Sequence, residues 1–239
     1  MREKDLVSFT VVVKETDLLI HASSNLKRKA LKAIMKYRRI LESYIEKNPD
    51  FLTSLKPLPL RDGEPLIIKA MIEATAKAGV GPMASVAGAI AEFVGKELLE
   101  FSPQVIVENG GDIYLKSTEK RVIGIYAGSS PLSGKIGLEI DGRDTPLGIC
   151  TSSGTVGHSL SYGRADAVVV LSPSTPLADA CATAIGNLIK QPQDIEEALK
   201  FAQKIDGLRG VLIIVGDELG AWGEVNLCPI QTLVLEDLK

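Results

Sequence analysis

The chain has 239 residues, a formal net charge of −3 and 45% hydrophobic residues. This length can bury a substantial core, and the acidic balance argues against general binding to nucleic acid or to a membrane surface. Aromatic residues make up only 5%, so platforms for stacking bases are scarce. No apolar stretch of signal-peptide length follows the first residues, and no later segment reaches membrane-spanning length without polar interruption. We therefore expect a cytoplasmic protein.

The first third of the chain predicts a hairpin followed by helices. Residues 9–13 and 18–21 are apolar runs on either side of a polar turn, which favours two paired strands. Apolar residues then recur at helical spacing from 26 to 45, and most positions between them are basic. Three prolines predict a break at 48–63, and helical spacing resumes over 65–78. The basic run is either a surface for an anionic partner or, more simply, a solvated helix face.

Residues 78–95, AGVGPMASVAGAIAEFVG, place a glycine turn before a helix of small residues. Gly79 and Gly81 bracket the turn, and Pro82 suits the first position of a helix. A glycine turn at a helix N-terminus presents free N–H groups to an anion such as phosphate, so Gly81 is a candidate ligand-binding residue. The alternative is a helix that packs tightly against the core.

The middle of the chain predicts several short strands. An apolar strand at 104–108 leads into Asn109, Gly110, Gly111 and Asp112, a turn that needs glycine dihedrals, and the partner strand continues at 113–115. Read alone, this turn is an ordinary hairpin connection. Further strands are expected at 122–127, 136–140 and 146–150.

Residues 150–187 form the most informative stretch, with a hydroxyl-rich loop, an apolar strand at 167–171 and a helix. With Thr175 as the N-cap, Pro176 occupies the first helical position. Asp179 and Thr183 then lie one turn apart on one face, where two oxygens can bind Mg²⁺, a cation that prefers oxygen ligands and keeps several waters. Alternatively, Asp179 complements the helix dipole and Thr183 packs.

Three residues of this stretch are candidate catalytic groups. His158 can act as acid or base near neutral pH, and Ser153 is a candidate nucleophile or substrate ligand. Cys150 is a third candidate, although Cys150, Cys181 and Cys228 lack the spacing of a zinc site or a disulfide framework. Structural roles for the histidine and the cysteines are the alternatives.

The remaining pattern is a helix at 195–205 and strands at 211–215 and 230–235. Together these elements predict one α+β domain over residues 1–239, with a mixed, mainly antiparallel sheet and several packed helices.

Four segments occur in an order that resembles the ApbE superfamily, whose best-known members are FAD:protein FMN transferases. They are AGVGPMASVAGAIAE, VENGGDI, CTSSGTVGHS and LADACATAIGN, and they look closest to an uncharacterised family related to ApbE. The resemblance is strong over about residues 70–190. It implies an ApbE-like fold, magnesium at Asp179 and Thr183, and a flavin nucleotide (FAD or FMN) pocket at Asn109, Gly110, Gly111, Asp112, Thr151, Ser152, Ser153 and Gly154.

Two departures bear on activity. The transferases carry a lysine in the helix that matches residues 79–88, and a histidine-led HIIDP-like segment after their TSG loop; here only His158 could stand in. These departures argue against the usual flavin transfer but less against binding a phosphate-bearing small molecule. Relatives in the related family are associated with sulfur assimilation towards homocysteine, so a sulfur-handling factor using Cys150 or Cys181 is an alternative. A non-catalytic flavin or nucleotide binder is another. The partner expected in each case is a small molecule, and a homodimer is left open.

Overall fold

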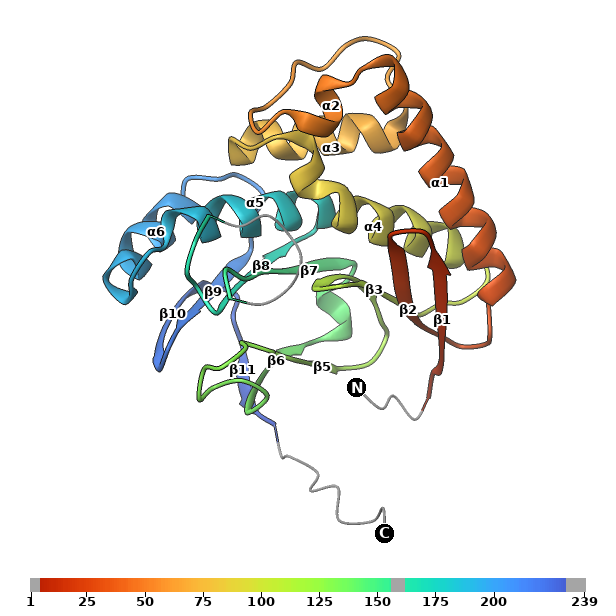
Figure 1. Ribbon diagram of the computed structural model, residues 1–239. Coiled ribbons are helices and arrows are strands. Elements are labelled where there is room, and N and C mark those ends of the chain that lie inside the picture. The colour runs from red at the N-terminus through yellow and green to blue at the C-terminus, as the bar shows by residue number, and fades with distance from the viewer. Residues whose placement is uncertain (1–4, 156–161, 231–239) are drawn as a thin grey trace.

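The computed structural model describes residues 5–155 and 162–230 (Figure 1). Its largest element is an eight-stranded sheet with strand order β1-β2-β3-β4-β7-β8-β9-β10, in which neighbouring strands pair antiparallel. The strands are β1 (Val7–Val13), β2 (Thr16–Ala22), β3 (Val105–Asn109), β4 (Asp112–Lys116), β7 (Leu147–Ser152), β8 (Ala167–Ser172), β9 (Gly210–Val215) and β10 (Glu218–Gly223). Strand β8 is buried along its whole length, which explains its unbroken apolar run.

Helices cover one face of this sheet (Figure 1). The inner layer contains α1 (Lys27–Lys47), α4 (Val86–Leu98), α5 (Thr175–Leu188) and α6 (Ile195–Ala202). Helices α2 (Asp50–Thr53) and α3 (Leu66–Ala78) lie outside them, and a 3-10 turn at Pro82–Ser85 leads from α3 into α4. Helix α3 ends at Gly79, whose φ of 76° is the left-handed conformation that glycine adopts freely.

A small three-stranded sheet covers part of the opposite face (Figure 1). It has the order β11-β6-β5, again antiparallel, and consists of β5 (Arg121–Gly124), β6 (Ile136–Ile140) and β11 (Leu227–Pro229). Apolar side chains of both sheets form one core cluster, which includes Ile106, Leu138 and Ile149, each no more than 1% exposed. Each such side chain contributes roughly 1.5–3 kcal/mol through burial.

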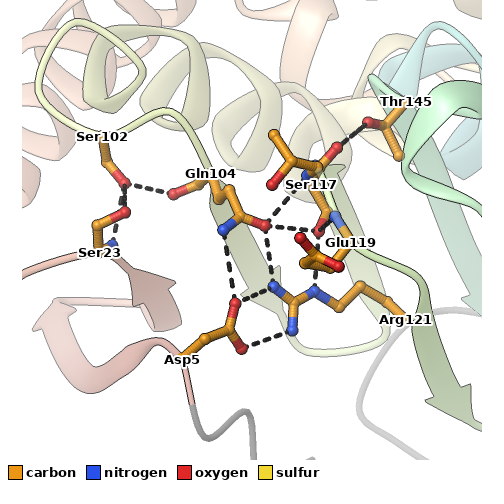
Figure 2. Close-up of polar contacts among 9 residues, drawn as sticks. Asp5, Ser23, Ser102, Gln104, Ser117, Glu119, Arg121 and Thr145 are labelled. Carbon is orange, nitrogen blue, oxygen red and sulfur yellow. Dashed lines mark hydrogen bonds and ion pairs between the residues drawn. The ribbon is translucent and has the colours of Figure 1, made fainter.

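A polar cluster around Arg121 anchors the small sheet to the large one (Figure 2). The Arg121 side chain is 3% exposed and donates to both carboxylate oxygens of Asp5, at 2.9 and 2.7 Å. It also donates to Gln104 Oε1 at 2.9 Å and to Ser117 Oγ at 2.8 Å. The guanidinium lowers the pKa of Asp5 to about 2. Because Asp5 precedes β1 and Gln104 precedes β3, the cluster holds the start of β5 against the large sheet.

The predicted fold class is confirmed, and the differences have local causes. Strands β10 and β11 are not predicted because ELGAWG and LCP are rich in glycine or contain proline and lack β-branched alternation. The expected break at 48–63 contains the one-turn helix α2, whose Phe51 is fully buried. Apart from Ile230, the strand expected at 230–235 lies outside the described residues.

Within the described residues, no single helix has the length and apolar composition needed to span a membrane. One pair, Leu66–Ala78 with Pro82–Leu98, reaches that threshold only when both are counted together, and a bend of 103° separates them.

Candidate functional site

A cavity of about 700 Å³ lies between the small sheet and one end of the large sheet. One wall is apolar and comes mainly from β5, β6 and the segment after β5. The other end is polar and comes from the β3–β4 turn, the end of β7 and α5. The lining residues are Glu15, Asp17, Ala87, Glu108, Asn109, Gly110, Gly111, Asp112, Ile113, Ile123, Gly124, Ile125, Tyr126, Leu138, Ile149, Thr151, Ser152, Ser153, Val169, Asp179 and Thr183.

The β3–β4 turn brings its polar groups to the cavity. Asn109 pairs with Asp112 across the turn, and Gly110 takes a φ of 66°. The Asn109 amide donates to the carbonyl oxygen of Ala87 at 3.1 Å, which fixes the turn against the start of α4. A Cβ on Gly111 would come within 3.0 Å of the Thr151 carbonyl oxygen, so this position allows the turn to approach β7 closely.

Helix α5 supplies Asp179 and Thr183. The helix begins at Thr175, one residue earlier than predicted, so Ser174 and not Thr175 precedes it. Asp179 is therefore the fifth helical residue, beyond the first turn. Its Oδ2 accepts a hydrogen bond of 2.8 Å from the backbone N–H of Gly88, near the start of α4. The expected spacing of one turn between Asp179 and Thr183 is present, and both residues line the cavity.

Asp112 and Asp179 form a buried pair of carboxyl groups. Burial raises the pKa of Asp112 to about 7, and a hydrogen bond with the Cys150 side chain offsets part of this effect. The pKa of Asp179 is also raised well above its usual value, first by burial and then by repulsion from Asp112, although the N–H groups of Gly88 and Ala87 oppose the shift. Two carboxyl groups that repel each other in a dry site favour a proton or a cation between them.

The charge of the whole lining is one-sided. It contains five carboxyl groups, from Glu15, Asp17, Glu108, Asp112 and Asp179, and no Lys, Arg or His among the residues described. Burial also raises the pKa of Glu108. In the described part of the lining an anionic ligand would meet no basic side chain, so a cation or backbone N–H groups would balance its charge there.

The structure groups most of the predicted site residues. Those that line the cavity are Asn109, Gly110, Gly111, Asp112, Thr151, Ser152, Ser153, Asp179 and Thr183. Cys150 is fully buried behind this surface, and its thiol donates weakly to the Thr175 carbonyl oxygen at 3.4 Å. Gly154 lies just past the lining, where its N–H donates to Ala165 O. The candidate catalytic residue His158 lies outside the described residues.

Gly81 lies apart from this group. A Cβ at Gly81 would overlap the carbonyl oxygen of Ser54 at 1.7 Å, so the missing side chain lets the turn pack against the end of α2. Its role in the fold is close packing. A smaller cavity of about 370 Å³, near Tyr44 and Phe51, contains none of the predicted site residues.

The sequence did not predict two parts of the lining, the apolar wall and the carboxylates of Glu15 and Asp17. Ile123, Tyr126 and Leu138 belong to predicted strands, but their position opposite the β3–β4 turn depends on how the two sheets stack. Glu15 comes from the β1–β2 turn and Asp17 from the start of β2, and the pairing of Leu18 with Asn109 brings both beside the cavity. The predicted hairpins indicate which consecutive strands pair, but they do not indicate that β2 lies beside β3.

The metal-binding capacity of the site rests on few side chains. Among the described residues, no group of three or more His, Cys, Asp and Glu side chains has an arrangement suited to a metal ion. Asp179 and Thr183 can supply two oxygens, which suits Mg²⁺ better than Zn²⁺ because magnesium usually retains several waters.

Comparisons with known proteins agree with this architecture. A family model described as "AbpE bacteria" matches residues 1–225. A UPF0280 protein of Methanococcus aeolicus is 45% identical over 201 residues, covering 82% of this chain and 81% of the relative. A UPF0280 protein of Methanothermobacter thermautotrophicus is 43% identical over 242 residues, covering 99% of this chain and 89% of the relative.

Solved structures show the same fold at low sequence identity. The flavin transferase ApbE from Vibrio cholerae is similar with a TM-score of 0.59 and 15% identity, covering 91% of this chain and 96% of that chain. The apo form of the Pseudomonas stutzeri flavinyl transferase ApbE has a TM-score of 0.59 and 14% identity, with coverages of 91% and 94%. The chain therefore belongs to the UPF0280 family, a family related to ApbE.

Proposed function

We propose that the cavity binds a phosphate-bearing small molecule, a flavin or another nucleotide, together with Mg²⁺ at Asp179 and Thr183. The observation that carries the proposal is the position of these two oxygen-bearing side chains, one turn apart in α5, at the polar end of a large cavity and beside a second buried carboxyl group. The resemblance of the fold to the flavin transferases of Vibrio cholerae and Pseudomonas stutzeri supports group transfer as the reaction class.

The residues present suit a divalent cation. Repulsion between Asp112 and Asp179 disfavours ionisation of these carboxyl groups. The described lining has no basic side chain to offset that repulsion. A cation would relieve that repulsion and would also neutralise the charge of an incoming phosphate. The N–H groups of Gly88 and Ala87 hold the Asp179 carboxyl group in position at the lining of the cavity.

The shape of the cavity suits a ligand with two unlike ends. Its volume lies within the usual range of small-molecule sites, about 300–1,000 Å³. Ile123 and the exposed Tyr126 offer an apolar wall for a ring system, while the turn at Gly110 and Gly111 offers backbone groups to a polar tail. Ser153 lines the cavity and remains the candidate to contact the reacting end of the ligand.

The sulfur-handling alternative receives less support from the geometry. Burial raises the pKa of the Cys150 thiol well above its usual value, and the neighbouring carboxylates raise it further. Burial also raises the pKa of Cys181, to about 12. A nucleophilic cysteine needs an accessible thiolate, and neither side chain is exposed. Without catalysis, the same cavity would act as a flavin or nucleotide binder.

Calorimetric titration tests the proposal directly. Mg²⁺ is titrated into the protein, and FMN and FAD are then titrated with and without Mg²⁺. The Asp179→Asn and Thr183→Val variants keep the shape of each side chain but remove a metal ligand, and each should weaken Mg²⁺ binding by about tenfold or more. Asp217→Asn removes an exposed carboxylate elsewhere and serves as the control. Mg²⁺ affinity that is the same in all four proteins would refute the metal site, and the absence of nucleotide binding with Mg²⁺ present would refute the ligand class.

A further inference from the structure

Helix α1 carries a regular row of exposed side chains on the face opposite the core. Its buried residues are Ala30, Ala33, Ile34, Tyr37 and Leu41. At 100° per residue, the opposite face presents positions separated alternately by four and three residues, the spacing of a coiled-coil seam. We call this row the α1 stripe; its members, all exposed, are Arg28, Lys32, Met35, Arg39, Glu42 and Glu46.

The α1 stripe faces solvent at the border of the molecule. Helix α1 runs along one outer side of the fold, away from the small sheet (Figure 1). Met35 is 48% exposed, and Leu31, which lies next to the stripe, is 40% exposed. The centre of the row therefore consists of Met35 and Arg39, with Leu31 beside it, and its two ends carry opposite charges.

The charges of the α1 stripe are poorly matched to their own helix. Arg28 lies in the first turn, where the helix dipole is positive, and this turn has no acidic residue and no side-chain cap. Glu46 lies in the last turn, where the dipole is negative. Charges so placed cost about 0.3–1 kcal/mol each. In the described part of the chain, Arg28, Lys32, Arg39 and Glu46 form no ion pair.

Some exposed charges of the helices are paired within their own helix. Ion pairs one turn apart join Lys69 to Glu73 in α3 and Lys200 to Glu196 in α6. In α1, Glu42 binds Lys14 and Arg38, and both contacts use Oε1. Within the described residues, Arg28, Arg39 and Glu46 of the α1 stripe therefore remain exposed charges without an ion pair.

We propose that the α1 stripe is a dimer interface in which a second copy of the chain packs its own α1 antiparallel across a two-fold axis. The row is self-complementary in that arrangement: Arg28 faces Glu46 of the partner subunit, and Lys32 faces Glu42 of the partner subunit. Met35 then faces the aliphatic part of Arg39 of the partner subunit, near the axis. Each of these contacts occurs twice, as in any isologous interface.

The antiparallel arrangement also corrects the mismatch with the dipole. Arg28 would lie beside the C-terminal end of the partner's helix and Glu46 beside its N-terminal end, where each charge is favourable. An anionic surface such as a membrane or a nucleic acid could bind the cations of the α1 stripe but would repel Glu42 and Glu46, whereas an antiparallel second copy pairs both ends. The charge pattern thus favours a second copy over either.

The expected dimer is weak and sensitive to salt. A helix of 21 residues is about 31 Å long, so one helix pair buries less than the ~1,200–2,000 Å² of a standard interface. Its ion pairs are exposed at the rim and are screened within about 8–10 Å at physiological ionic strength. A dissociation constant in the micromolar range or weaker is consistent with this size.

Sedimentation equilibrium of charge-reversed variants of the full chain tests the interface. Arg28→Glu and Glu46→Arg should each weaken self-association of the protein by about tenfold or more, because each places like charges opposite one another twice. Mixing the two variants should restore association as a heterodimer, since both end pairs are then attractive. The double variant Arg28→Glu/Glu46→Arg should also dimerise.

The control is Lys204→Glu, which makes the same change of charge as Arg28→Glu at an exposed position outside α1 and should associate like the wild type. Both single substitutions suit the helix dipole, so their thermal stability should not fall, and unfolding cannot account for lost association. A wild type that stays monomeric up to near-millimolar concentration at low salt would overturn the proposal. This holds even if the protein sediments with phosphatidylserine vesicles, which would indicate binding to an anionic surface instead. So would a mixture of single variants that remains monomeric.

Discussion

The carboxylate of Glu92 in α4 accepts a hydrogen bond of 2.7 Å from the backbone N–H of Thr175, the first residue of α5. In return, Asp179 in α5 accepts one of 2.8 Å from the N–H of Gly88, near the start of α4. Each helix thus supplies the carboxylate that caps the other. Asp179 is both a capping group and a candidate metal ligand, so its position is set by the packing of two helices.

Glu92→Ala should lower the free energy of unfolding by about 1–3 kcal/mol. The substitution leaves the buried N–H of Thr175 without its acceptor and removes the partner of Lys96, whose Nζ lies 2.6 Å from Glu92 Oε1. Glu92→Gln keeps an acceptor oxygen and should lose less. Urea unfolding of the three proteins measures the difference, and an equal effect of both substitutions would show that the cap is unimportant.

Gly88→Ala should destabilise the protein and disturb the candidate metal site. A Cβ at this position would come within 2.7 Å of the Thr175 carbonyl oxygen and 2.9 Å of Asp179 Cβ, so α4 and α5 would have to move apart. Overpacking of this kind typically costs about 1–3 kcal/mol.

Gly186→Ala is the matched control in α5. Its nearest neighbour is Ser152 Oγ at 3.5 Å, an ordinary contact, and alanine favours a helix by about 0.5–1 kcal/mol over glycine. Thermal unfolding and Mg²⁺ titration should separate the two variants. A Gly88→Ala protein as stable as Gly186→Ala would contradict the close crossing of the helices.

The free energy of unfolding of the ligand-free protein should fall as pH rises from about 4 to about 7. Asp112 has a pKa near 3.8 when exposed and about 7 in the folded protein, so the folded state holds the proton over this interval and the unfolded state releases it. The stabilisation is complete below the lower value and is lost through the higher one. Asp112→Asn should reduce the loss, by roughly 1–4 kcal/mol, in urea titrations at a series of pH values.

Two further results would test whether Asp112 causes this pH dependence. Asp179 has a raised pKa as well, so part of the pH dependence should persist in Asp112→Asn. Saturating Mg²⁺ should flatten the curve if it binds the ionised carboxylates. An Asp112→Asn protein with the full wild-type pH dependence would place the titration elsewhere.

Thiol labelling should distinguish the three cysteines. Cys150 and Cys181 are fully buried and have raised pKa values, while Cys228 is partly exposed in β11. Iodoacetamide should modify Cys228 in the native protein, and all three cysteines should react after unfolding. Rapid labelling of native Cys150 at neutral pH, detected by mass spectrometry of peptides, would restore the sulfur-handling alternative.

The polar half of the candidate site could be predicted because its signals are local. The turn at Asn109–Asp112 needs glycine dihedrals, and the spacing of Asp179 and Thr183 is a property of one helix. The fold class followed from the periodicity of the same segments.

The rest depends on contacts between distant residues. The Glu92–Thr175 cap joins positions 83 residues apart, and the small sheet that forms the apolar wall pairs β6 with β11 from the end of the described chain. Gly81 illustrates the converse: its local pattern is typical of an anion site, but packing against Ser54 explains the glycine. A single sequence contains no signal for either relation.

The two walls of the cavity belong to different sheets, and the small one is held by its apolar face and by the Arg121 cluster. A molecule that contacts both walls links the two sheets, and its binding stabilises their packed arrangement by mass action. Amide hydrogens of β5 and β6 should then exchange with solvent more slowly when the cavity is filled, with little change in the helices on the opposite face.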